Sequence, residues 1–103
     1  MTDHPGKHFL WGFNQTEQTT FAKLYVGQTV QVAWSPYLIM REQRSVEWLS
    51  KNMNSSIGKV RMVAARGATR LIVLDRAKRK RALLIPLACI YSISLMIPGY
   101  DEE

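Results

Sequence analysis

The chain has 103 residues, 47% of them hydrophobic, which suffices for one domain with its own core and excludes disorder of the whole chain. Its one cysteine, Cys89, excludes an intramolecular disulfide and a cysteine-rich metal site. The N-terminus lacks the apolar segment of a secretory signal, so a cytoplasmic location is expected. The formal net charge is +6, and nine of the 14 Lys and Arg residues lie between residues 58 and 81, which favours a polyanionic partner.

The first quarter of the chain predicts an arm followed by a helix. Residues 1–13 contain aromatic residues interrupted by glycine, and we expect them to form an irregular arm. Asn14 and Glu17 have the spacing of a capping box, in which each side chain bonds the backbone of the other residue. The apolar residues that follow share one helical face until Gly27. This pattern predicts a helix over residues 15–25.

The next segment predicts a strand and then an inserted helix. Val30, Val32 and Trp34 alternate with other residues at the period of a half-buried strand. Pro36 is suited to the first position of a helix. Apolar residues then recur at helical spacing, so we expect a helical insertion within residues 36–54.

The basic segment begins as a strand. Residues 57–66 alternate with a period of two, which places Lys59 and Arg61 on a solvent face. Gly67 supplies a turn, and residues 70–75 are apolar on both faces, as in a strand that is buried on both sides.

The sequence RAKRKR at residues 76–81 has three interpretations: a stop-transfer signal, a nuclear-type basic tag, or the tip of a hairpin. The uncharged run that follows is nearly long enough to span a membrane. However, Pro86 would interrupt a helix, and the residues after it alternate at strand period up to about Ile97. We therefore predict a cationic hairpin loop between strands at 70–75 and 82–85, a bend at Pro86, a last strand, and no membrane span.

Together these elements predict a mainly β fold with short helices in a single domain, residues 1–103. Short strands that bury both faces in so small a chain close most readily into a bent barrel. We expect a small five-stranded antiparallel barrel over residues 26–97, with an N-terminal helix, an inserted helix, and an acidic tail at 98–103.

This order of elements resembles the Sm-like (LSm/Hfq-type) family. The residues that carry the resemblance are TTFAKLYVGQTVQVAW, RLIVLD, and the spacing of Ile85, Ile90 and Ile93. A generic SH3-like barrel fits almost as well. The resemblance implies the barrel, a tendency to bind RNA, and a homo-oligomeric ring. It transfers no ligand residue, because Pro86 and Leu87 stand where Sm proteins usually carry Arg-Gly.

No catalytic or cofactor motif is present in the sequence. His4 and His8 are separated by Pro5 and Gly6, so we expect them to be unstructured rather than to bind a metal. Cys89 lies in an apolar run, where burial makes a packed core residue more plausible than a nucleophile. We therefore predict a non-catalytic protein with no metal and no cofactor.

The remaining class of function is binding, and nucleic acid, RNA in particular, is the favoured partner. Cations would neutralise phosphates, and an exposed aromatic residue would stack on a base. Trp34 and Trp48 are expected to pack in the core. The predicted nucleic-acid-binding residues are Lys59, Arg61, Arg66, Arg70, Arg76, Lys78, Arg79, Lys80, Arg81 and Tyr37.

Two other partners remain open. The domain could be a protein-interaction module, such as a viral or mobile-element factor that docks on an acidic surface of a host protein, or a structural assembly component. The same cations could also hold the protein at an anionic membrane surface. Affinity for RNA, compared with affinity for an acidic protein and for anionic vesicles, would distinguish these hypotheses.

Overall fold

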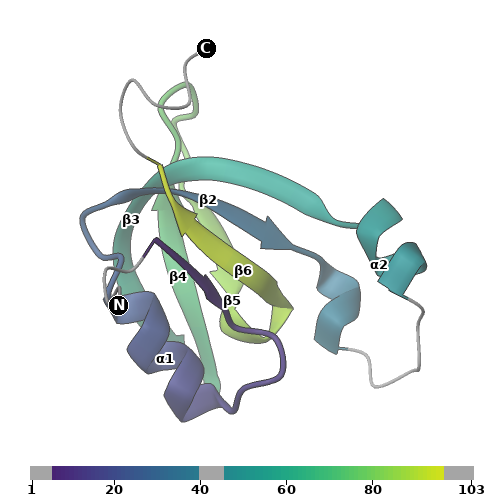
Figure 1. Ribbon diagram of the computed structural model, residues 1–103. Coiled ribbons are helices and arrows are strands. Elements are labelled where there is room, and N and C mark those ends of the chain that lie inside the picture. Colours follow the sequence, from purple (N-terminus) through teal and green to yellow (C-terminus); the bar gives the residue numbers. More distant parts are fainter. Residues whose placement is uncertain (1–5, 40–45, 97–103) are drawn as a thin grey trace.

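The computed structural model describes residues 6–39 and 46–96, which form one six-stranded antiparallel sheet (Figure 1). The strand order is β1-β6-β2-β3-β4-β5. The strands are β1 (Lys7–Phe9), β2 (Thr29–Trp34), β3 (Asn54–Arg66), β4 (Thr69–Asp75), β5 (Leu83–Pro86) and β6 (Ile90–Leu95). The helices are α1 (Gln15–Lys23) and α2 (Val46–Lys51), with 3-10 turns η1 (Pro36–Ile39) and η2 (Leu87–Cys89).

The prediction of a mainly β fold with short helices is confirmed, but the closed five-stranded barrel is wrong. The five predicted strands are present as β2 to β6, and a sixth strand, β1, pairs with β6. A strand has only two edges, and β6 already pairs with β2 on one edge and with β1 on the other. Because β1 occupies this place, β5 does not close the described sheet onto β6.

β1 lies within the segment that we predicted to be an irregular arm. Its three residues pair with Ser92, Ile93 and Ser94 of β6. Leu10 extends the attachment, because its backbone N–H donates to the carbonyl oxygen of Tyr91 at 2.9 Å. A three-residue strand is too short to show a clear period, and its partner lies near the other end of the sequence.

Helix α1 confirms the helix predicted over 15–25, although it ends at Lys23, and its capping box is present. Glu17 N–H donates to Asn14 Oδ1 at 2.8 Å, and Asn14 N–H donates to Glu17 Oε1 at 3.1 Å. Ala22 is fully buried on the helix face that packs against the sheet. Gly27, with a φ of +86°, then turns the chain toward β2.

The hydrophobic core lies between α1 and one face of the sheet. Val30 and Val32 of β2, Ile72 and Leu74 of β4, and Ile93 of β6 are fully buried there. No helix of the described residues covers the part of the opposite face formed by β1, β6, β2 and the first half of β3 (Figure 1). We call this part the uncovered face. Paired residues of neighbouring strands share a face, so it carries Lys7, Ser94, Gln31 and Lys59.

The helical insertion predicted within 36–54 is only partly helical where the structure describes it. Its first residues form the 3-10 turn η1, and α2 has six residues. Asn54 already belongs to β3. Residues 40–45 lie outside the described part of the chain.

The uncharged run after Arg81 forms β5, η2 and β6 instead of one helix, as its strand period predicted. Pro86 is the last residue of β5, which is an edge strand. Proline is tolerated there because one side of the strand has no neighbour that needs an N–H donor. Within residues 6–39 and 46–96, no helix has the length and hydropathy needed to cross a membrane. The predicted acidic tail at 98–103 lies outside the described residues.

Candidate nucleic-acid interface

Residues 76–82 join β4 to β5 as a loop that projects from one end of the sheet (Figure 1), which confirms the predicted hairpin tip. Four consecutive cations, Lys78, Arg79, Lys80 and Arg81, are exposed there. Among the described residues, ion pairs join only Lys51 to Glu47 and Arg61 to Asp75, so none involves these four side chains. The loop therefore presents positive charge that no described carboxylate compensates.

Arg76 differs from the other cations of the loop. It is half-buried at the end of β4, and its carbonyl oxygen accepts from Arg79 N–H at 3.1 Å. Its Nε is buried and has no hydrogen-bond partner within the described residues. Arg76 therefore contributes to the packing of the loop base as well as to its charge.

β3 places two cations beside the base of the loop. Lys59 pairs in register with Asp75, the last residue of β4. The register shifts between Val60 and Met62, and this bulge inserts Arg61 on the same side. The Arg61 guanidinium donates to Asp75 from Nε to Oδ2 at 2.9 Å and from Nη2 to Oδ1 at 2.5 Å. Arg61 thus lies at the predicted surface, but its charge is already paired.

The two charged groups stabilise each other in their ionised forms. The hydrogen bonds from Arg61 hold the pKa of Asp75 below its ordinary value, and Lys59 adds to this effect by attraction. The same hydrogen bonds raise the pKa of Arg61. Asp75 is the one acidic residue between 58 and 81, and the sequence did not reveal which cation it neutralises.

Arg66 and Arg70 lie at the other end of the β3–β4 hairpin. Arg66 pairs with Thr69 beside the turn, and Arg70 Nη1 donates to the carbonyl oxygen of Gly67 at 3.4 Å. Six residue steps along β4 separate this turn from Asp75, which corresponds to roughly 20 Å. The structure therefore does not bring Arg66 and Arg70 together with the loop.

Arg70 instead borders two shallow pockets near α1. One, of about 390 Å³, also has Trp11, Phe13 and Gln15 in its lining. The other, of about 300 Å³, lies between Arg70 and Lys23. This end of the molecule is thus a second, smaller cationic region.

Tyr37 lies in η1, near the end of β2 that is farthest from Lys59. Its side chain is 42% exposed, and its ring packs edge-to-face against Trp48 with centroids 5.2 Å apart. We expected Trp34 to lie in the core, but it is only partly buried and packs against the edge of the core. Its Nε1 donates a hydrogen bond to Ser56 Oγ at 3.0 Å. Tyr37 is therefore accessible, but it is not part of the surface around the loop.

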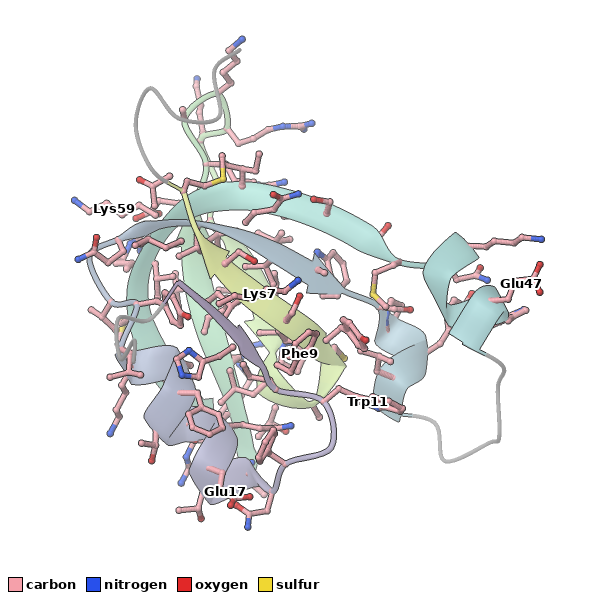
Figure 2. The ribbon with its side chains drawn as sticks, in the orientation of Figure 1. Lys7, Phe9, Trp11, Glu17, Glu47 and Lys59 are labelled. Carbon is pink, nitrogen blue, oxygen red and sulfur yellow. The ribbon has the colours of Figure 1, made fainter. Side chains whose placement is uncertain are left out.

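Sequence reasoning missed the aromatic residues that β1 presents. Phe9 and Trp11 are each 47% exposed, and Lys7 Nζ lies 5.0 Å from the Phe9 ring centroid. Figure 2 shows Lys7, Phe9 and Trp11 following one another along β1 and the turn after it. The sequence does carry a signal for this strand, because Lys7, Phe9 and Trp11, which are exposed, alternate with His8 and Leu10. We did not recognise this alternation because glycines interrupt the aromatic run on both sides of it.

Cys89 and His8, which we considered as a nucleophile and as a metal ligand, make contacts within the fold. Cys89 is buried, and burial raises the pKa of its thiol. His8, predicted to be unstructured, instead lies in β1 with Nδ1 2.7 Å from the hydroxyl oxygen of the buried Tyr25. His4 lies outside the described residues. Within the described ranges, no group of three or more His, Cys, Asp or Glu side chains could hold a metal ion.

No protein family, curated protein or solved structure matches the chain. The candidate interface is therefore defined by charge, exposure and strand register. The structure gathers seven of the ten predicted residues at the loop end of the sheet: Lys59, Arg61, Arg76, Lys78, Arg79, Lys80 and Arg81. It places Arg66 and Arg70 at the opposite end and Tyr37 in η1.

Proposed function

We propose that this protein is a non-catalytic nucleic-acid-binding protein that holds single strands, RNA above all, on the 76–82 loop and the adjoining Lys59. The observation that carries the proposal is the run of four exposed cations at residues 78–81, none paired with a carboxylate of the described chain. Cations that contact phosphates release condensed counterions, which is the main source of affinity for nucleic acid without sequence preference.

Single strands suit this surface better than a duplex. A duplex groove is commonly read by a basic helix or by a two-stranded ribbon with cations along its strands. The β4–β5 hairpin carries most of its cations in the loop, and β5 itself has none. Among the described helices, α2 has six residues and α1 carries one Glu and one Lys. A single strand needs only a cationic path with exposed aromatic rings beside it. The loop supplies the cations at one end of the sheet, and Lys59, Lys7 and Phe9 lie on the uncovered face next to it.

We also propose that the open sheet is a variant of the Sm-like or SH3-like type of fold and that the protein assembles as a homo-oligomer. Helix α1 leads into β2, which is the order of elements on which the resemblance rests. The sheet has two short edge strands, β1 and β5, whose outer backbone groups could pair with a second copy. Light scattering over a range of concentrations tests this, and a constant monomer mass would contradict it.

The test of nucleic-acid binding compares two variants of equal charge. In the loop variant, Arg79, Lys80 and Arg81 are replaced by Gln. In the control, Lys23, Lys51 and Arg66 are replaced by Gln, which removes three exposed cations from other parts of the molecule. Fluorescence anisotropy measures the affinity of each variant for single-stranded RNA at several salt concentrations.

We expect the loop variant to bind RNA more weakly and the control to stay close to the wild type. The slope of log affinity against log salt should shrink by about 0.7 for each phosphate that the variant no longer neutralises. Equal affinity of all three proteins would contradict the proposal. A loop-dependent affinity for polyglutamate or anionic vesicles, with none for RNA, would favour an acidic protein or a membrane surface.

A further inference from the structure

The segment after Gly6 exposes three aromatic side chains at alternate positions. Phe9 and Trp11 are each 47% exposed and Phe13 is 44% exposed, whereas Leu10 between them is fully buried. Large exposed apolar side chains that gather on one surface mark interaction sites more often than isolated ones do. These rings therefore need an explanation beyond packing, since about half of each is still in contact with water.

Phe9 and Trp11 are held in place by one ring of β6. Tyr91 packs edge-to-face against Phe9 with centroids 5.4 Å apart, and it lies 6.0 Å from Trp11 at an interplanar angle of 34°. The backbone is fixed as well, because Leu10 N–H donates to the carbonyl oxygen of Tyr91 at 2.9 Å. The two exposed rings are thus pre-organised, so binding a flat partner would cost them little conformational entropy.

The charge beside these rings suits a polyanion. Lys7 lies over the Phe9 ring, and the register aligns Lys7 with Ser94, Gln31 and Ile57 across β6, β2 and β3. Lys59 is two residues beyond Ile57, so the Cα atoms of Lys7 and Lys59 are separated by roughly 16 Å. The residues aligned between them carry no negative charge, and Figure 2 shows Lys59, Lys7, Phe9 and Trp11 in succession on the molecule.

We infer that Phe9 and Trp11, supported by Tyr91, form a base-stacking platform for single-stranded nucleic acid, with Lys7 beside it to contact a phosphate. The inference rests on the proposed function, since the platform would bind the same strand that the cationic loop holds. Exposed aromatic rings next to a cationic path are the usual composition of surfaces that bind single strands. The floor between Lys7 and Lys59 contains the polar Ser94 and Gln31 beside the exposed Ile57, which offers a strand polar atoms for its backbone and an apolar side chain for a sugar or base.

The test separates stacking from charge by using two ligands. One is an oligothymidine strand, and the other is an abasic sugar-phosphate strand of the same length, which has the phosphates and no bases. The variant replaces Phe9 and Trp11 by Leu, which keeps apolar bulk and removes the aromatic faces. Met62→Leu is the control, because Met62 is apolar and also 47% exposed but lies on β3, which β6 and β2 separate from β1.

We expect the Phe9→Leu, Trp11→Leu variant to bind oligothymidine at least about fivefold more weakly than the wild type, the low end of the effect of one stacked base. Its affinity for the abasic strand and its salt slope should stay unchanged, because the phosphate contacts remain. The Arg79, Lys80 and Arg81 variant should instead weaken binding of both strands and reduce the salt slope.

Each outcome bears on one of the two proposals. If the loop variant weakens both strands but the Leu variant binds oligothymidine like the wild type, the platform is wrong and the proposed function stands. If neither strand binds and single-stranded RNA does not bind either, the proposed function fails. The affinities of the wild-type protein for the two strands provide a test that does not depend on how a variant folds. If the wild type binds the oligothymidine strand and the abasic strand equally well, base stacking is excluded.

Discussion

Arg61 donates two hydrogen bonds to Asp75 across β3 and β4, at the base of the cationic loop. The ion pair removes one positive charge from the surface that we propose for nucleic acid. It also places a carboxylate beside that surface, where it repels phosphates. Asp75 should therefore limit the affinity of the protein for a polyanion.

Replacing Asp75 by Asn should strengthen binding to single-stranded RNA, because the substitution removes this repulsion and frees Arg61. If Arg61 then contacts a phosphate, the salt slope should become steeper by about 0.7. Arg61→Gln is the matched comparison, since it leaves the carboxylate unpaired and should weaken binding. Equal affinities of the two variants, measured by fluorescence anisotropy, would show that the pair lies outside the interface.

The titration of Asp75 should also report the ion pair. Its pKa is lowered in the folded protein, so the pair's contribution to stability is present above the unfolded-state pKa of about 3.9 and is lost as pH falls through the lower folded pKa. In Arg61→Gln the pKa should rise toward the ordinary value. Carboxyl chemical shifts followed by NMR from acidic to neutral pH measure it, and an unchanged midpoint would contradict the hydrogen-bonded geometry.

Gly58 lies where β3 and β4 approach closely. A Cβ atom there would lie 2.4 Å from the carbonyl oxygen of Asp75 and 2.9 Å from Leu74 Cγ. Because a backbone oxygen cannot move away without disturbing the strand pairing, Gly58→Ala should destabilise the protein by about 1–3 kcal/mol. The melting temperature should fall by several degrees for each kcal/mol. The exposed neighbour Lys59→Ala is the control and should melt close to the wild type.

Tyr25 is fully buried, and burial raises its pKa to about 12. Because the pKa is raised in the folded protein, the neutral Tyr25 side chain makes a contribution to stability that is fully present below the unfolded-state pKa of about 10. This contribution is lost as pH rises toward 12. Tyr25→Phe removes the hydroxyl group that lies against His8, at a cost of roughly 0.5–1.5 kcal/mol near neutral pH, but it should remove this alkaline dependence. Melting temperatures measured from neutral to alkaline pH test this, with the exposed Tyr37→Phe expected to follow the wild type.

The sequence determined those elements whose signals are local. Asn14 and Glu17 fixed the start of α1, because capping acts between residues three apart. The alternation of Val30 and Val32 and the apolar run of 70–75 specified β2 and β4, because burying one or both faces of a strand leaves a period in the chain. The cationic loop was predicted for the same reason, since it lies directly between two such strands.

Only the tertiary structure decided which residues from distant parts of the chain meet. The pairing of β1 with β6 joins the two ends of the described chain, and it both prevented closure of the sheet and placed Phe9 and Trp11 against Tyr91. The bulge at Arg61 paired that side chain with Asp75, and the length of β4 separated Arg70 from the loop. These outcomes depend on strand register and on which edge is free, and neither leaves a periodic mark in a single sequence.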